Sequence, residues 1–404
     1  MPDNTSHSIL IVADAFGKPG YAPRLRSICD HLLQKGWQVE VYTEQFIPLD
    51  FPHDYPIHEC ALYRNRTWDW AFKTAWSILT DWKNRAFARW LLAATQDKHY
   101  NLVFCTTFST FPLRAAYAVA QAKHLPLHVD LRDLDEQAPN SQYQAHRQWW
   151  ARPFRALYRT INIHRRNRVI SKAQCVTTVS PWHVDFLRSL NDHVHLIYNG
   201  YDNRLFEPKD TPVDTFQIVY TGRIYESALQ DPTLFVQAIG TLPPLTHFAV
   251  LWYTDKRGQQ TIRRLAEQFN CAARMQYADY VPTAQVPTLL QHSSIALVLS
   301  HKAGKNGPHG IMTTKFFEAL GVEKPVLCVP SDEECLAAVI QETNAGIAAR
   351  NVEEIKAFIL DKYAEWQKNG VTRQAVHPEQ KKLFSRQQQA LQFEQLFLDI
   401  IQKK

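Results

Sequence analysis

The stretch Ala303–Pro325, AGKNGPHGIMTTKFFEALGVEKP, predicts a phosphate-binding turn that leads into a helix. It places glycines and the pair Thr313-Thr314 just before a helical pattern that carries Lys315 and Glu318 one turn apart. N–H groups at a helix N-terminus are free and carry partial positive charge, so a phosphate binds there while first-turn side chains reach an attached sugar. The stretch therefore indicates a site for a diphosphate and a ribose, and the predicted ligand class is a nucleotide-sugar.

Outward from this stretch, short β-branched runs alternate with helical patterns along the chain. One series begins with a strand at Ser8–Ala13 and a helix at Ala22–Lys35, and another begins with a strand at Phe216–Thr221 and a helix at Asp231–Gly240. Such alternation predicts an α/β fold in which parallel sheets are covered by helices on both faces. A polar, turn-rich segment after Asp202 separates the two series, so we expect two doubly wound domains.

The expected site follows from this architecture. In open parallel sheets, ligands bind beyond the carboxyl ends of the strands. Two such domains that face each other create a cleft, and we expect the chemistry to lie there. The predicted domains cover residues 1–206 and 211–383, and a last helix lies within residues 384–404.

The composition is that of an ordinary globular protein, with 45% hydrophobic and 21% charged residues. No run approaches the roughly 20 apolar residues that cross a bilayer, and Asp3 stands where a signal peptide requires basic residues, so we expect a cytoplasmic protein. The seven cysteines show no C-x-x-C spacing, which indicates neither a zinc site nor a disulfide framework.

Two tracts concentrate basic and aromatic side chains. Residues 64–90 hold five of the eleven tryptophans, and residues 139–174 hold seven arginines and one lysine without an acidic residue. A nucleic-acid surface, a solvated and partly buried helical pair, and a membrane-facing surface all remain open. No nucleic-acid motif accompanies the charge. We favour contact with an anionic membrane, where each basic residue contributes about 1 kcal/mol.

Several short motifs resemble those of GT-B glycosyltransferases of the family-four type, and their order agrees over nearly the whole chain. They are Thr177–Pro181, Ile197–Asp202 with Phe206, Tyr220–Arg223, the Lys315–Glu318 helix, Gly321–Pro330 and Phe384–Arg386. The resemblance implies a GT-B fold of two Rossmann-like domains that face each other across a cleft, with the last helix crossing back to the first domain. It also implies retention of anomeric configuration, no cofactor and no required metal.

On the donor side, the resemblance assigns the leaving diphosphate to two cations. Arg223 follows Gly222 at the end of an apolar strand, where a guanidinium meets phosphate oxygens in a bidentate manner, although it could instead cap carbonyls. Residues 224–230, where relatives place a lysine, hold no cation, so Lys315 is the expected second charge. Glu318 is expected to accept the ribose hydroxyls, and the alternative is an intrahelical pair with Lys315 worth about 0.2–0.5 kcal/mol.

The donor sugar is expected to meet a different set of residues. The family often carries a glutamate eight positions before the ribose-binding one, and here that position is Gly310. His309 or the amides of Gly310 and Ile311 are therefore expected to contact the sugar. Gly17 and Gly20 in the first loop are expected to approach the diphosphate or the acceptor, although a plain strand-to-helix turn also uses glycine.

On the acceptor side, a polar cluster ends the strand that begins at Leu127 and resembles the D-x-R-D of bacterial relatives. Its members are His128, Asp130, Arg132 and Asp133. We expect them to bind the acceptor, with Asp133 or His128 orienting it. An Asp–Arg pair that holds a loop in place is the alternative.

These observations predict a metal-independent retaining glycosyltransferase. It is expected to move a sugar from a nucleotide-diphosphate sugar to a glycan or lipid-linked acceptor in cell-surface polysaccharide synthesis. The expected location is the cytoplasm, peripheral on the inner face of the membrane. A nucleotide-sugar 2-epimerase of the same fold and a catalytically silent subunit that binds a glycan or a partner remain alternatives.

Overall fold

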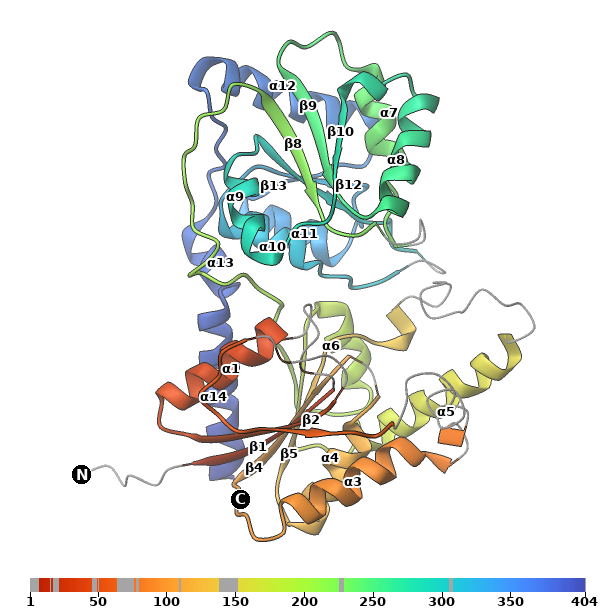
Figure 1. The fold of residues 1–404 in the computed structure, drawn as a ribbon, viewed down its shortest axis with the longest axis vertical. Helices are drawn as coiled ribbons and strands as arrows, with labels where there is room; N and C mark the ends of the chain where they lie inside the picture. The colour runs from red at the N-terminus through yellow and green to blue at the C-terminus, as the bar shows by residue number, and fades with distance from the viewer. Residues whose placement is uncertain are drawn as a thin grey trace. The chain divides into compact units, whose positions relative to one another are not determined.

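The computed structural model describes residues 7–14, 16, 22–45, 49, 51–63, 76–77, 80–108, 110–137, 152–224, 229–304 and 308–403. The described residues form two compact units (Figure 1). The first contains the residues up to Asp135, residues 152–198 and the stretch from Arg386 onward, and the second contains Glu136, Gln137 and Asn199–Ser385. No helix in the described part of the chain is long and apolar enough to cross a membrane.

The first unit is built on a parallel sheet with the strand order β3-β2-β1-β4-β5-β6-β7. Its strands are β1 (Ser8–Ala13), β2 (Gln38–Glu44), β3 (Ile57–Cys60), β4 (Leu102–Thr107), β5 (Leu127–Leu131), β6 (Cys175–Thr178) and β7 (Val194–Leu196). Its helices are α1 (Ala22–Gln34), α3 (Trp82–Ala94), α4 (Leu113–Ala122), α5 (Arg152–Ile170), α6 (Pro181–Arg188) and α14 (Arg386–Gln402).

Helices cover both faces of this sheet because successive strand residues point to opposite sides. Along β1, Ile9 and Ile11 pack into the cluster that contains side chains of α1 and α14. Leu10 and Val12 pack into the cluster that contains side chains of α3, α4 and α6. Both faces of β1 are therefore core, which explains why its sequence is a continuous apolar run.

The C-terminal helix α14 belongs to the first unit. Its Phe393 ring lies 5.5 Å from the Phe104 ring of β4, and its Glu394 lies 2.7 Å from His31 of α1. Helices α1 and α14 lie side by side in Figure 1. The end of the chain thus completes one covering layer of the N-terminal sheet.

The second unit repeats the architecture with the parallel strand order β10-β9-β8-β11-β12-β13. Its strands are β8 (Phe216–Thr221), β9 (Phe248–Tyr253), β10 (Met275–Ala278), β11 (Ile295–Leu299), β12 (Val326–Val329) and β13 (Gly346–Ala348). Its helices are α7 (Thr233–Thr241), α8 (Lys256–Gln268), α9 (Val286–Gln291), α10 (Thr314–Gly321), α11 (Cys335–Thr343), α12 (Val352–Asn369) and α13 (Pro378–Leu383), joined by short 3₁₀ turns.

The unit boundary lies at Asn199, a few residues before the end expected for the first domain at residue 206. The reason is close packing at Gly321 of α10. A Cβ atom placed on Gly321 would lie 2.7 Å from Phe206 and 2.9 Å from Tyr201. The segment from Asn199 to Phe206 therefore packs as part of the second unit.

Candidate functional site

Three of the donor-side residues predicted from the sequence, Gly222, Arg223 and Lys315, lie at the carboxyl end of β8. This strand lies between β9 and β11, so the chain turns to opposite sides of the sheet there, and such switch points bind ligands in α/β folds. Gly222 follows β8 with a φ of +128°, and a Cβ atom there would lie 2.3 Å from Cε of Lys315. The missing side chain of Gly222 makes the room that the Lys315 side chain occupies.

Lys315 is a positioned cation. Its Nζ lies 5.7 Å from the centroid of the Tyr220 ring. Among the residues that the structure describes, it has no hydrogen-bond or ion-pair partner. Burial lowers the pKa of the Lys315 ammonium, and the negative charge of Glu318, one turn along α10, opposes this shift. A bound anion would favour the charged form, because an opposite charge nearby raises the pKa of an amine.

Arg223 follows Gly222 in the chain and already has a carboxylate partner. Its Nε lies 3.2 Å from Oδ2 of Asp255, and 65% of the Arg223 side chain is exposed. Oδ1 of Asp255 also accepts a hydrogen bond from the N–H of Gly258 and caps α8. The guanidinium is therefore held at the end of β8 with most of its surface open to solvent.

The N-terminus of α10 adds partial positive charge near Lys315. Thr313 is the N-cap residue in extended conformation, and its side chain makes no capping hydrogen bond. The first turn, which begins at Thr314, contains no acidic residue. The N–H of Phe316 donates to the carbonyl of Thr313 at 3.2 Å, so the N–H groups before it carry the partial positive charge at the start of α10.

A carboxylate that the sequence analysis missed reaches the loop before α10. Glu334, which follows β12, places Oε1 2.7 Å from Nδ1 of His309 and accepts a hydrogen bond from the N–H of Gly310 at 3.4 Å. Gly310 has a φ of +61°, a conformation that favours glycine. Glu334 therefore contacts both His309 and Gly310, two of the residues expected to contact the donor sugar. The third, Ile311, lines a cavity of about 10 Å³ with Gly310 and Glu334.

Glu334 had no signal in the sequence because it lies 24 residues from Gly310. Its neighbour Asp332 has a structural role, because its carboxylate accepts hydrogen bonds from the N–H groups of Leu336 and Ala337 at the start of α11. Only the folding of β12 beside β11 brings this loop to the residues before α10. The resemblance led us to expect a glutamate at position 310, which is a glycine here. The carboxylate of Glu334, from a distant part of the chain, lies beside Gly310 instead.

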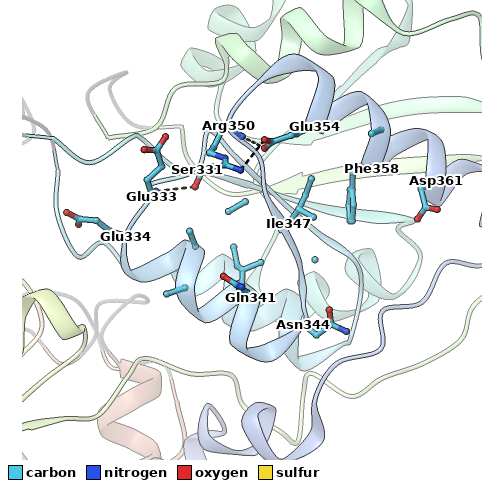
Figure 2. A pocket seen from close by; sticks show the side chains of 16 residues that line it. Ser331, Glu333, Glu334, Gln341, Asn344, Ile347, Arg350, Glu354, Phe358 and Asp361 are labelled. Atoms are coloured by element: carbon cyan, nitrogen blue, oxygen red, sulfur yellow. Dashed lines mark hydrogen bonds and ion pairs between the residues drawn. The ribbon is translucent and has the colours of Figure 1, made fainter.

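A cavity of about 1000 Å³ in the second unit lies beside the edge strand β13 between α11 and α12 (Figure 2). Gln341 of α11 and Asn344 at the end of this helix line it, and dashed lines in Figure 2 join Arg350 to Glu354, whose Nη2 and Oε1 atoms lie 3.4 Å apart. Its acidic side chains are Glu333, Glu334, Glu354 and Asp361. With Arg350 as the one basic residue of this lining, the surface of the cavity is negative and is unfavourable for a phosphate.

In the first unit, a buried ion pair joins the ends of several strands. Asp130 of β5 is 0% exposed and receives hydrogen bonds from Thr106 and Thr177, both at 2.9 Å. Nη2 of Arg24 lies 3.1 Å from its Oδ1, and Arg24 also donates to the carbonyls of Ile197 and Tyr198. The expectation that Asp130 binds an acceptor is therefore wrong. Asp130 instead fits the alternative, an Asp–Arg pair that holds a loop in place. Its partner is Arg24 of α1, which is not a member of the predicted cluster.

The positive charge of Arg24 keeps Asp130 ionised. Burial alone would raise the pKa of Asp130, but the charge and hydrogen bonds of Arg24 lower it below the ordinary value, helped by Arg132 and Thr177. Asp130 therefore stays ionised in the folded protein. No local pattern in the sequence indicated this pair, because Arg24 and Asp130 are 106 residues apart.

His128 is a core residue, which corrects its expected role in orienting the acceptor. It is 0% exposed, and its ring lies 5.3 Å from Phe104 and 5.2 Å from Phe397. Its Nε2 lies 3.1 Å from Oγ1 of Thr177, and its Nδ1 has no hydrogen-bond partner. Burial lowers the pKa of His128 to about 3, although the charge of Asp130 opposes this shift. The side chain is thus neutral and inaccessible to a substrate.

We expect stability to fall when the pH drops from 7 to 5. Burial also lowers the pKa of His183 to about 3, so both histidines stay neutral in the folded state. In the unfolded state they bind protons near their ordinary value of about 6.5. Stability is therefore retained above that value and is lost as the pH falls below it, by up to about 1.4 kcal/mol per pH unit for each histidine.

Urea unfolding at pH 7, 6 and 5 measures this loss. The matched variant His128→Leu is expected to have a shallower dependence on pH than the wild type, because it removes one proton taken up on unfolding. The exposed His292 provides the control, since His292→Leu leaves both buried histidines in place. If the free energy of unfolding changed with pH by the same slope in the wild type and in His128→Leu, this would contradict the conclusion that His128 is neutral in the folded state.

Comparison with known proteins finds a family likeness for the N-terminal part of the chain. Residues 19–200, which are less than half of the chain, match the family described as "Glycosyl transferase 4-like domain". No curated protein sequence matches the chain. The resemblance noted in the sequence is thereby confirmed for the N-terminal half.

Solved structures extend the likeness to both units. Sucrose-phosphate synthase from Thermosynechococcus elongatus is 16% identical with a TM-score of 0.67, over 98% of this chain and 100% of that one. Anabaena HepE in complex with UDP and glucose is 14% identical with a TM-score of 0.67, over 97% and 100%. UDP-GlcNAc 2-epimerase from Neisseria meningitidis bound to UDP-GlcNAc is 11% identical with a TM-score of 0.55, over 98% and 100%. The chain has the GT-B fold, as the sequence predicted.

Two of the expected acceptor-side residues, Arg132 and Asp133, lie just beyond β5. Arg132 is 6% exposed and stacks over the Phe108 ring with its Cζ 5.0 Å from the centroid. Asp133 is exposed, and its N–H donates to the carbonyl of Phe108 at 3.0 Å. Of the four clustered residues, Asp133 is the one whose side chain is open to solvent.

The remaining predicted elements lie partly or wholly outside the described residues. Gly17 and Gly20 are among them, as are residues 64–75 and 138–151 of the two basic tracts. The described parts of the tracts include residues of α3 and α5, and both helices lie within the residues that match the family.

Proposed function

We propose that the protein is a retaining glycosyltransferase that moves a sugar from a nucleotide-diphosphate sugar to a glycan or lipid-linked acceptor. The observation that carries the proposal is the contact of Lys315 with Gly222, which places an unpaired cation at the switch point of the second sheet. The N-terminus of α10 and the exposed guanidinium of Arg223 add positive charge around the same strand end. This arrangement suits a diphosphate.

The comparisons support a nucleotide-sugar as the donor. HepE is in complex with UDP and glucose, and the 2-epimerase is bound to UDP-GlcNAc, so proteins of this fold bind such ligands. The match of residues 19–200 to the glycosyl transferase 4-like family favours transfer over epimerisation. We therefore assign the carboxylate of Glu318 to the ribose and the loop from His309 to Ile311, with Glu334, to the transferred sugar.

The proposed mechanism stabilises the departing nucleotide. The slow step separates an oxocarbenium-like sugar from the diphosphate, so negative charge develops on the leaving phosphate oxygen. Lys315, Arg223 and the N–H groups at Thr313 and Thr314 hold that charge and lower the barrier. With retention, the leaving phosphate accepts the proton of the acceptor hydroxyl as the new glycosidic bond forms on the same face.

On the acceptor side we assign orientation of the acceptor to Asp133, because it is the exposed carboxylate of the strand-end cluster. A lipid-linked or membrane-bound acceptor fits the basic tracts, and it places the reaction at the cytoplasmic face of a membrane in polysaccharide synthesis. The reaction as proposed requires no metal, since fixed cations of the protein neutralise the diphosphate.

Glu318→Ala is expected to weaken nucleotide binding by about tenfold or more, because a carboxylate that accepts ribose hydroxyls makes hydrogen bonds of roughly 1.5–3 kcal/mol. Titration calorimetry with nucleoside diphosphates measures the change. The control is Glu353→Ala on α12, which also removes a glutamate one turn from a lysine. An unchanged affinity for Glu318→Ala would refute the ribose contact.

The function is tested with a panel of nucleotide-sugars and glycan or lipid-linked acceptors. Transfer of the sugar to an acceptor, with the anomeric configuration of the product read by NMR, is the expected result. An altered free nucleotide-sugar without transfer would indicate the epimerase. Binding without turnover of any donor would indicate a silent subunit.

A further inference from the structure

A small cavity in the second unit is lined largely by polar and charged side chains. Its volume is about 260 Å³, and three segments line it, residues 208–210, 322–324 and 372–374. All of these residues are described by the structure and belong to the same unit. We propose that this cavity binds a small oxyanion, of the phosphate or carboxylate class, that also carries a hydroxyl group, and that Lys324 holds its charge.

The cavity lies at the opposite edge of the sheet from the donor-side residues. Lys324 is two residues before β12, and Thr372 donates a hydrogen bond at 2.5 Å to the carbonyl of Ser294, which directly precedes β11. Both positions are at the amino ends of these parallel strands, whereas Gly222 follows the carboxyl end of β8. The proposed site is therefore separate from the one that we assign to the diphosphate.

Lys324 is a buried cation in the lining of this cavity. The residue is 2% exposed, and its ammonium group forms no hydrogen bond or ion pair with any residue that the structure describes. Burial lowers the pKa of the Lys324 ammonium, the charge of Asp210 opposes this shift, and the charge of Arg373 adds to it. A buried ammonium without a partner is costly, so an oxyanion bound beside it would stabilise the charged form.

The carboxylates that line the cavity have other partners. Asp210 accepts two hydrogen bonds from the guanidinium of Arg373, one of them from Nε at 3.0 Å. Oε1 of Glu323 lies 2.7 Å from Nζ of Lys381 of α13. Each carboxylate therefore has its own cation, and neither of them forms an ion pair with Lys324. The oxyanion that would pair with this lysine has to come from solution.

Gln374 also lines the cavity and has a buried acceptor. Its Nε2 donates to the carbonyl of Asn344 at 2.8 Å, which assigns the orientation of the side-chain amide. Its Oε1 is buried and forms no hydrogen bond within the described structure. An ionised oxygen of a ligand would satisfy Lys324, and a hydroxyl hydrogen of the same ligand would satisfy Gln374. These two requirements lead to an oxyanion that carries a hydroxyl group.

The volume of the cavity and its other cations also fit a small anion. About 260 Å³ is less than the roughly 300–1,000 Å³ of typical small-molecule sites. Lys209 and Arg373 are exposed members of the lining, and their positive charge attracts an anion from solution. The arrangement combines exposed cations that attract the ligand with one buried cation that holds it.

The first test is titration calorimetry at pH 7 and constant ionic strength, with inorganic phosphate, glycolate and acetate as probes. It is carried out in a Lys315→Ala background, which removes the cation assigned to the diphosphate. Adding Lys324→Met is expected to weaken phosphate binding about tenfold or more, because a charge-assisted hydrogen bond is lost. The control Lys356→Met removes another part-buried lysine of the same unit, one that pairs with Glu353, and is expected to leave the affinity unchanged.

A second variant changes only an exposed side chain. Arg373 is 68% exposed, and Arg373→Gln removes one cation from the lining and releases the carboxylate of Asp210. This variant is expected to weaken phosphate binding by a smaller factor than Lys324→Met. Its control is Arg350→Gln, since Arg350 is 65% exposed and also pairs with a carboxylate, that of Glu354. Thermal melts verify that each variant is folded.

The three probes define the ligand class. Tighter binding of phosphate than of glycolate indicates a phosphate ligand, and the reverse indicates a carboxylate. Equal affinities for glycolate and acetate would overturn the requirement for a hydroxyl group, because acetate lacks one.

The proposal as a whole is overturned if neither phosphate nor glycolate binding depends on Lys324. It is also overturned if the two controls weaken binding as much as Lys324→Met and Arg373→Gln do, because the effect would then follow net charge and not the cavity.

Discussion

Replacing Lys315 by alanine is expected to lower turnover by about a hundredfold or more, by analogy with the removal of one donor from an oxyanion hole. The ammonium has no ion-pair partner among the described residues and lies against Gly222 at the end of β8. In the proposed reaction it stabilises charge that develops as the nucleotide leaves. The effect should therefore appear mainly in kcat, with a smaller change in KM.

Initial rates with the preferred donor measure this effect. Lys356→Ala on α12 is a matched control, because that part-buried lysine also has a glutamate one turn away, in this case as an ion-pair partner, and lies on a helix of the same unit. Gly222→Ala gives an independent test, since its Cβ atom would meet the Lys315 side chain at 2.3 Å. It should reduce turnover while Lys315 is still present. Wild-type rates for Lys315→Ala would remove this residue from the mechanism.

Asp130→Asn is expected to lower the free energy of unfolding by about 3–5 kcal/mol, because it leaves Arg24 buried without its counter-charge. The side chains of the pair are 6% and 0% exposed, so water cannot replace the lost partner. Arg24 also bonds to the carbonyls of Ile197 and Tyr198, and the loss should loosen the end of the first unit. The measurement is urea unfolding at pH 7.

The control for this variant is Asp185→Asn, which breaks the exposed pair with Arg188 and is expected to cost less than about 1 kcal/mol. The double variant Arg24→Leu with Asp130→Leu separates the loss of a partner from the value of the pair, since joint replacement by apolar groups is often tolerated. If Asp130→Asn were as stable as the wild type, Asp130 would not be the structural anchor described here.

The donor side was predictable because its signals are local in the chain. Gly222 and Arg223 end one strand, and Lys315 and Glu318 lie one turn apart on one helix. Strand and helix periodicity was enough to place each of them at a strand end or helix start. The contact of Lys315 with Gly222 agrees with that placement, whereas the partners Asp255 and Glu334 lie far along the chain and gave no local signal.

The acceptor side was harder to predict because polar residues near a strand end can point inward or outward. His128 and Asp130 alternate with apolar neighbours along β5 and looked accessible from the sequence. The helix α14, more than 250 residues later, covers His128 with Phe393 and Phe397, and Arg24 neutralises Asp130. Burial and charge pairing of this kind arise from segments distant in the chain, so no local pattern contains them.

The alternating pattern of the chain was enough to predict two parallel sheets, their order along the chain and the cationic turn before α10, because strand and helix periods and helix-end chemistry act over a few neighbouring residues. Folding then selected which polar groups face solvent. It buried His128 and Asp130, joined Glu334 to His309, and gathered Lys209, Lys324 and Arg373 around one cavity. These outcomes depend on contacts between remote segments, whose desolvation and charge pairing are set by tertiary packing.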